Sequence, residues 1–312
     1  MSTLKVDAIV DKDSGNTATI NGQVIGVGNT KGRNLVINGG FDVWQRGTTF
    51  TTSGVTFCAD RFAHYDGSPV SNNVSRSTDV PTEPGVAYSC LLKGGVDLRA
   101  TVELPTNGVR GLFQANKKFT LSFYAKRSSA GTLSLSPELR FTSGAGYSTA
   151  GNAWSGTPTH ALSTDWTRHS ATYTCDQAPT SSHYAVGFTL GSSATVDVYV
   201  TGIQLEEGEV ATNFETKSYA ECLTECQRYY WEDSGTALKY YQQYSQSYRM
   251  MEVDHPVKMR TTPAATIVNN GSASSTVFHA NAYHYKAYVN LAYDSDQPRY
   301  TTSYKFNAEL TG

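Results

Sequence analysis

The sequence predicts an all-β protein with a single short helix. Charged residues make up only 17% of the 312 positions, below the roughly 25% of an average globular domain, and Thr, Gly and Tyr are frequent. Apolar and polar residues alternate with a period of two through much of the chain, which is typical of antiparallel sheet. The length leaves room for about two domains with cores of their own.

Residues 1–33 predict a separate N-terminal β arm. Ala18–Ile20 and Gln23–Ile25 flank the dipeptide Asn21-Gly22, a strong signal for a two-residue hairpin turn. A lone hairpin is marginally stable in water. We therefore expect this arm to pack on a partner surface or on sister chains.

Residues 34–215 predict a β-sandwich. Phe119, Leu121 and Phe123 alternate with polar neighbours, as do Val198 and Val200 further on. No helical pattern in this segment could cover a parallel sheet, so two packed antiparallel sheets are expected.

Residues 216–231 predict a linking helix. Ser218 and Glu221 have the spacing of a capping box, which satisfies two backbone donors in the first turn. Cys222, Cys226 and Tyr229 recur at three- and four-residue intervals and form a mildly apolar stripe. Because so short a helix does not persist alone in water, we expect the stripe to dock on a sheet or on copies of itself.

Residues 232–312 predict a C-terminal β domain rich in tyrosine. Twelve of the twenty tyrosines follow residue 226. Tyrosine offers a large contact area at low entropic cost, so this end is either an exposed recognition tip or a subunit interface. The tyrosines concerned are Tyr240, Tyr241, Tyr244, Tyr248, Tyr283 and Tyr285.

Composition argues against several classes of partner. A net charge of −2 gives no attraction for nucleic acid or an anionic membrane. No apolar run approaches the ~20 residues of a membrane span, and the polar N-terminus lacks the apolar core of a signal peptide. The five cysteines are an odd number without a Cys-x-x-Cys pair, which favours reduced thiols over a disulfide framework.

The sequence also lacks the usual signals of an enzyme or a cofactor site. Glu206 and Glu207 are adjacent and point to opposite sides of an extended chain, so we expect a solvated acidic turn and not an acid/base pair. Asp11–Gly15 and Asp294–Asp296 match a calcium loop poorly. We expect no catalytic residue, no cofactor and no specific metal ligand, and leave a structural calcium open.

Aromatic residues provide the positive signal for a ligand. Trp154 and Tyr147 lie in the Gly/Ser/Thr-rich segment 141–158, where we expect exposed side chains that stack on a sugar ring. The alternative is that the tryptophan caps the edge of the sandwich. Trp44 and Trp166 adjoin strand patterns and are expected in the core.

Several short motifs occur in a fixed order along the chain. Residues 34–47 read Asn-Leu-Val-Ile-Asn-Gly-Gly-Phe-Asp-Val-Trp-Gln-Arg-Gly, and residues 59–62 read Ala-Asp-Arg-Phe. The later motifs are Gly202–Gly208, Ala211–Glu215, Cys226–Tyr230, Pro256–Pro263 and Asn307–Leu310. Together they resemble a domain of bacteriophage tail-fibre and virion-appendage proteins, which is itself similar to jelly-roll carbohydrate-binding modules.

The resemblance implies a structural, non-enzymatic virion protein, made in the host cytoplasm and usually homotrimeric. Its arm at 1–33 would join other virion proteins, and its outer β domains would contact a host-surface glycan, without nucleic acid or membrane insertion. Cys222, Cys226 and Tyr229 would then lie between sister helices. A capsid head fibre or decoration protein, and a polysaccharide depolymerase, are the alternatives.

Overall fold

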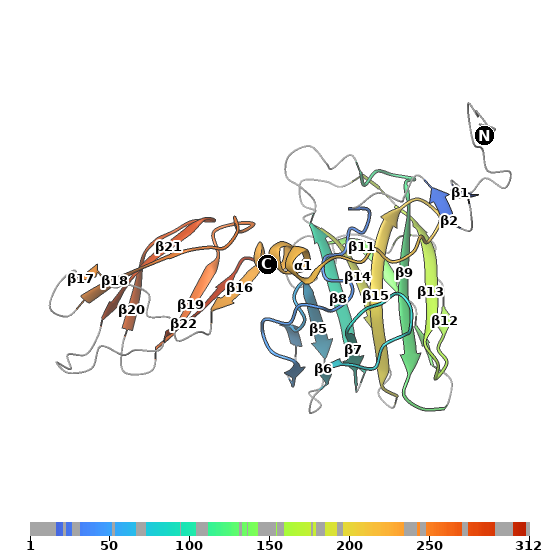
Figure 1. Cartoon of the computed structure of the whole chain (residues 1–312), viewed down its shortest axis with the longest axis horizontal. Helices are drawn as coiled ribbons and strands as arrows, with labels where there is room; N and C mark the ends of the chain where they lie inside the picture. The colour runs from blue at the N-terminus through green and yellow to red at the C-terminus, as the bar shows by residue number, and fades with distance from the viewer. Residues whose placement is uncertain are drawn as a thin grey trace, which may run out of the picture.

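The computed structural model describes much of the chain. The described residues are 17–20, 23–26, 32–51, 54–66, 73–93, 95–103, 112–130, 133–135, 137–142, 154, 159–175, 177–178, 185–191, 196–233, 242–243, 248–269, 274–290 and 302–309. Strands dominate them, with one α-helix, so the all-β prediction is confirmed (Figure 1).

The N-terminal hairpin has the predicted register. Its strands β1 (Thr17–Ile20) and β2 (Gln23–Gly26) pair antiparallel, with Ile20 opposite Gln23. The role of this hairpin as a virion-anchoring arm stays a prediction.

Two antiparallel sheets form the predicted sandwich (Figure 1). The six-stranded sheet has the order β13-β9-β15-β7-β6-β3, and the five-stranded sheet has the order β11-β14-β8-β5-β4. A small pair, β10 and β12, lies beside them. The bounds are β3 Thr49–Phe50, β4 Gly54–Phe57, β5 Phe62–Asp66, β6 Val74–Ser77, β7 Ser89–Leu92, β8 Asp97–Glu103, β9 Lys118–Arg127, β10 Ser134–Leu135, β11 Glu138–Thr142, β12 His160–Ala161, β13 Thr167–Thr174, β14 Ala185–Gly191 and β15 Val198–Glu207.

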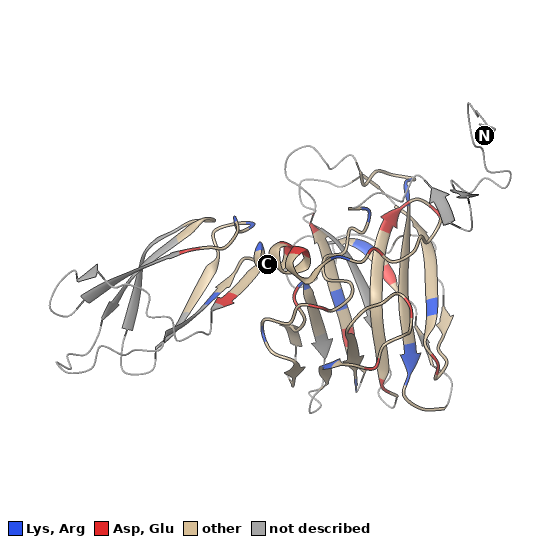
Figure 2. Ribbon diagram, viewed as in Figure 1, with Lys and Arg blue, Asp and Glu red and all other residues tan. Residues whose placement is uncertain are grey.

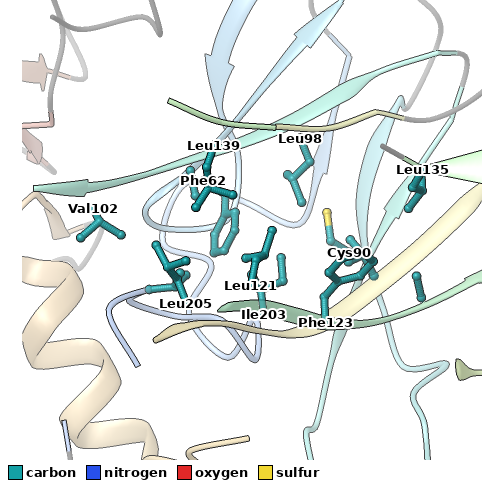
Figure 3. Close-up of a cluster of buried hydrophobic side chains, with 14 of the residues drawn as sticks. Phe62, Cys90, Leu98, Val102, Leu121, Phe123, Leu135, Leu139, Ile203 and Leu205 are labelled. Carbon is teal, nitrogen blue, oxygen red and sulfur yellow. The ribbon is translucent and has the colours of Figure 1, made fainter. Parts of the chain in front are cut away.

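The core lies between these two sheets (Figure 3). Phe119, Leu121 and Phe123 of β9 are fully buried, as the period-two pattern predicts. Phe62 comes from the opposite sheet and meets Leu121 within the same cluster. Burying these side chains away from water is the main favourable term for the sandwich.

Trp154 belongs to this core and is not exposed, so that prediction is wrong. Only 1% of its surface is accessible, and its ring contacts those of Phe119 and Phe141 at 5.5 and 5.3 Å. Its backbone NH donates to the carbonyl of Leu139 at 2.8 Å. The polar sequence around Trp154 suggested an exposed loop, but burial of the large indole outweighs the polarity of its neighbours. Tyr147 lies outside the described residues.

Glu206 and Glu207 are the last two residues of β15, so the predicted turn is wrong, and of the two only Glu207 is exposed. Glu206 is 4% exposed and accepts hydrogen bonds from the backbone NH and hydroxyl of Thr212. Thr120 donates to the carbonyl of Gly208, and Arg168 donates to the carbonyl of Thr212. Segment 208–215 therefore crosses one end of the outer face of the six-stranded sheet.

Helix α1 (Tyr219–Gln227) has the predicted capping box but ends earlier than residue 231. Ser218 and Glu221 exchange side-chain-to-backbone hydrogen bonds at 3.3 and 3.0 Å. Trp231 instead lies in strand β16 (Tyr230–Asp233). The backbone groups of this strand form hydrogen bonds with a distant strand, so they do not need the hydrogen bonds that a longer helix would provide.

The apolar stripe of α1 packs on its own chain. Cys222 and Cys226 are 3% and 0% exposed and form a cluster with Val43. The prediction that these side chains dock on copies of the helix is therefore wrong, because contacts within the chain already bury them. All five cysteines are free and buried, as expected for reduced thiols.

Charged side chains fix the junction between the sandwich and the C-terminal segment. We call Arg46, Asp60, Arg61 and Glu309 the charged joint. Arg61 and Glu309 are each 2% exposed and form an ion pair. Arg46 lies 3.3 Å from Glu309 and 3.6 Å from Asp60. A pair of buried charges is tolerated only when each charge has partners, and here each has them.

Two tyrosines cover the charged joint. The ring of Tyr229 lies 3.5 Å from the guanidinium of Arg61, and that of Tyr230 lies 3.6 Å from the guanidinium of Arg46. The hydroxyl of Tyr229 donates to Glu103 at 2.7 Å. Tyr229 is 3% exposed, so its predicted contact with a sister helix is also wrong. Aromatic faces stabilise cations at this distance.

The C-terminal segment contributes two further antiparallel sheets, ordered β16-β22-β19 and β17-β18-β21-β20 (Figure 1). Trp231 of β16 stacks on Phe306 of β22 at 5.3 Å. The bounds are β17 Gln242–Gln243, β18 Tyr248–Asp254, β19 Ala264–Asn269, β20 Ser274–Ala280, β21 His284–Asn290 and β22 Thr302–Asn307. Tyr283 is 57% exposed, while the side chains of the other five tyrosines named above lie outside what the structure describes.

Candidate functional site

One row of side chains crosses the outer face of the six-stranded sheet. In the strand register, Thr167 lies opposite Ala125, which places Trp166 beside Lys126. Lys126 lies opposite Tyr199. Tyr199 is followed by Leu91 on β7 and Ser75 on β6. We call these five residues, Trp166, Lys126, Tyr199, Leu91 and Ser75, the aromatic row; all are partly exposed.

Strand alternation brings the aromatic row to the surface. Phe123 and Ala125 of β9 point into the core, so Tyr124 and Lys126 point outward. On β15, Val198 and Val200 are buried and Tyr199 lies between them. The same alternation that builds the core thus presents aromatic rings to solvent.

The two rings are held at an angle with a cation between them. The centroids of Trp166 and Tyr199 are 6.3 Å apart, with their planes at 70°. The ammonium of Lys126 lies 5.5 Å from the first ring centroid and 5.0 Å from the second. Both distances are within the range of cation–π attraction, which favours this arrangement of the three side chains.

Asp79 holds the side chains of Trp166 and Lys126 in place. Its carboxylate accepts a hydrogen bond from the indole NH of Trp166 at 2.9 Å and from Lys126 at 2.5 Å. Partial burial acts to raise the pKa of Asp79, but these two hydrogen bonds and the charge of Lys126 lower it below its usual value. The carboxylate stays ionised and holds both partners in place.

A strap of chain, residues 78–88, borders the aromatic row. It runs between β6 and β7 and crosses in front of β15 and β9 (Figure 1). Gly202 lies beneath it at a bulge of β15, with φ of 60°. A Cβ there would lie 3.0 Å from the ring of Tyr124 and 3.5 Å from Pro84, so glycine allows this close approach.

Trp166 does not lie in the core, so the prediction for this residue is wrong. Its ring is partly exposed and its NH is bonded to an exposed carboxylate. The exposure of Trp166 follows from the register of β13 on β9, which places Trp166 beside an outward-facing position of β9. Trp44 is 8% exposed, so its assignment to the core is confirmed.

No metal centre occurs among the described residues. In that part of the chain no three or more His, Cys, Asp or Glu side chains come together to hold an ion. The weak calcium-loop candidates Asp11–Gly15 and Asp294–Asp296 lie outside it. Acidic and basic residues are interspersed over the described strands (Figure 2). Within the same residues, no helix is long and apolar enough to cross a membrane.

A β-sandwich that presents aromatic rings and charged hydrogen-bonding groups on a sheet face has the form of a binding domain. Residues 33–195 match the family described as carbohydrate binding domain, and the chain belongs to this family. A comparison with curated proteins found no match.

Several solved structures are similar to the chain. The xylan-binding domain CBM22-1 of Paenibacillus barcinonensis Xyn10C is 10% identical, with a TM-score of 0.35 over 57% of this chain and 96% of that domain. Tailspike protein 4 of bacteriophage CBA120, in its enzymatically active domain, is 16% identical, with a TM-score of 0.36 over 56% of this chain and 22% of that one. A Stig cyclase from Fischerella is 13% identical, with a TM-score of 0.38 over 57% and 98%.

Proposed function

We propose that the aromatic row is the glycan-binding surface of this carbohydrate-binding domain. The observation that carries the proposal is the fixed pair of partly exposed rings, Trp166 and Tyr199, with Lys126 and Asp79 between and above them. Aromatic faces stack on the apolar face of a sugar ring. The charged groups beside them donate to and accept from sugar hydroxyls, which orients the ligand.

The shape of the row favours an extended chain of sugars over a single ring. The row runs across five adjacent strands. At about 4.8 Å between strands, it spans roughly 19 Å. Contacts spread along an open surface are individually weak, and several copies of such a surface would raise the avidity.

A glycan array probed with the purified protein tests this proposal. We expect binding to one class of polysaccharide, and Trp166→Ala should weaken that binding roughly five- to tenfold, since a stacked aromatic ring contributes about 1–1.4 kcal/mol. Val55→Ala is the control, because Val55 is an exposed apolar residue of β4, in the five-stranded sheet, and does not belong to the aromatic row. Unchanged binding by Trp166→Ala, with the protein still folded, would exclude the row as the site.

We further propose that the protein is a non-enzymatic, homotrimeric tail fibre of a bacteriophage. The support is the order of motifs from residue 34 to residue 310. In this role the N-terminal arm joins other virion proteins, and the sandwich meets a glycan of the host surface.

Three measurements separate this role from its alternatives. Electron microscopy of labelled particles should place the protein on the tail, while a position on the head would indicate a capsid fibre or decoration protein. Sedimentation should give a mass of three chains. Incubation with host polysaccharide should leave its viscosity unchanged, and a loss of viscosity would indicate a depolymerase.

A further inference from the structure

A small pocket opens between the start of the sandwich and the beginning of α1. Its volume is about 130 Å³, and its walls come from residues 34–42, from 85–87 in the strap, and from 214–222. For comparison, an apolar cavity of ~150 Å³ can hold a benzene molecule. None of its lining residues belongs to the aromatic row.

Three different groups converge above Gly40 in this pocket. A Cβ at Gly40 would lie 3.1 Å from the carboxylate of Asp42, 3.3 Å from Val86 and 3.6 Å from the ring of Phe214. A carboxylate, an aliphatic group and an aromatic ring therefore surround one point that glycine leaves empty. Tyr219, with 59% of its surface exposed, stands at the rim.

Asp42 is the charged group in this pocket that has unmet hydrogen-bonding capacity. Its side chain is half-buried, and none of the described residues donates a hydrogen bond to its carboxylate. Burial raises its pKa above the ordinary value, because the charged form has lost part of its hydration. A hydrogen-bond donor on a bound ligand would replace the hydration that the carboxylate has lost.

The other charged residues of the lining are already engaged. Glu215 accepts from the backbone NH groups of Gly32 and Asn34. Lys217 donates to both oxygens of Glu225, at 2.8 and 2.9 Å. Once Lys217 is neutralised by Glu225, the pocket keeps a net negative charge, and this favours a cationic ligand.

We propose that this pocket is a second binding site, which takes a ring-sized ligand bearing a primary ammonium, such as an amino sugar with a free amine. The ammonium would donate to Asp42 and lie against the ring of Phe214, where hydrogen bonding and cation–π attraction act together. Val86 and the backbone at Gly40 would contact the apolar part of the ligand. The inference is independent of the glycan surface proposed above, since the two sites share no residue.

Calorimetric titration of the full chain with glucosamine and with glucose, near neutral pH and at equal ionic strength, tests the proposal. Glucosamine should bind saturably, and glucose, which has no amine, should bind at least about tenfold more weakly. Equal binding of the two sugars would overturn the assignment to an ammonium. Absence of saturable glucosamine binding at millimolar concentration would overturn the site itself.

Two variants and a control locate the binding. Asp42→Asn should weaken glucosamine binding at least about tenfold, whereas Glu209→Gln, which removes an exposed carboxylate paired with Lys118, should leave it unchanged. Gly40→Ala should block the pocket while its charge stays the same. The melting temperature of each variant shows whether it is folded. Full binding by a folded Asp42→Asn protein would refute the proposal.

Discussion

Removing Glu309 should uncouple the C-terminal segment from the sandwich. Its carboxylate pairs with Arg61 and Arg46, and both Arg61 and Glu309 are 2% exposed. In Glu309→Ala the guanidinium of Arg61 would remain buried without its ionic partner. Breaking a buried pair in this way costs about 3–5 kcal/mol of unfolding free energy. The loss is large beside the 5–15 kcal/mol that stabilises a typical domain.

Because the charged joint lies between two parts of the chain, the assay has to follow the unfolding of each part separately. Differential scanning calorimetry should show one cooperative transition in the unmodified protein and a separate, earlier one for the C-terminal segment in Glu309→Ala. Limited proteolysis after residue 227 should accelerate in parallel. Glu209→Ala removes an exposed ion pair with Lys118 and should cost no more than about 1 kcal/mol.

A double variant distinguishes the loss of the ion pair from the cost of leaving one charge buried without its partner. Arg61→Met combined with Glu309→Leu removes both charges and leaves side chains of similar volume. Such replacements are often neutral or stabilising, so stability should return in large part. If Glu309→Ala alone left the transition unchanged, the buried pair would not hold the two parts together, and the reasoning would fail.

The sequence predicts most of the fold because strand alternation is a local property. Phe119, Leu121 and Phe123 show their buried face by spacing alone, and Ser218 with Glu221 marks the start of α1. Strand order does not follow from such patterns. The register that brings Trp166 beside Lys126 and Tyr199 depends on pairing between distant segments, and the aromatic row was missed for that reason.

The errors in the predicted site share one physical cause. Trp154 lies in polar sequence, and Tyr229 lies on an apparent helix stripe, but both are buried by contacts with residues far away in the chain. Local polarity cannot reveal such contacts. In the same way, Arg61 and Glu309 are 248 residues apart, and the sequence gives no sign that they pair.

The short motifs acquire a common explanation in three dimensions. Arg46 and Asp60 come from the two N-terminal motifs, Tyr230 from the one that ends α1, and Glu309 from the last; all four meet at the charged joint. The backbone NH of Ala308 also donates to the carbonyl of Tyr229 at 2.7 Å. These motifs are therefore architectural, since they connect the sandwich to the segment that follows it.

Two further predictions concern buried side chains. Trp154→Ala should lower the unfolding free energy by about 3–5 kcal/mol, measured by chemical denaturation, because it empties a site between aromatic rings. Burial raises the pKa of Asp60 to about 6, although Arg46 and Gln45 partly oppose this, so the folded state binds its proton more tightly than the unfolded state does. Stability from this group is complete below its ordinary pKa of 3.8 and falls as the pH rises to about 6, by on the order of 3 kcal/mol. In Asp60→Asn the unfolding free energy should no longer fall between these pH values. If it still fell with pH in the variant, other titratable groups would be the cause.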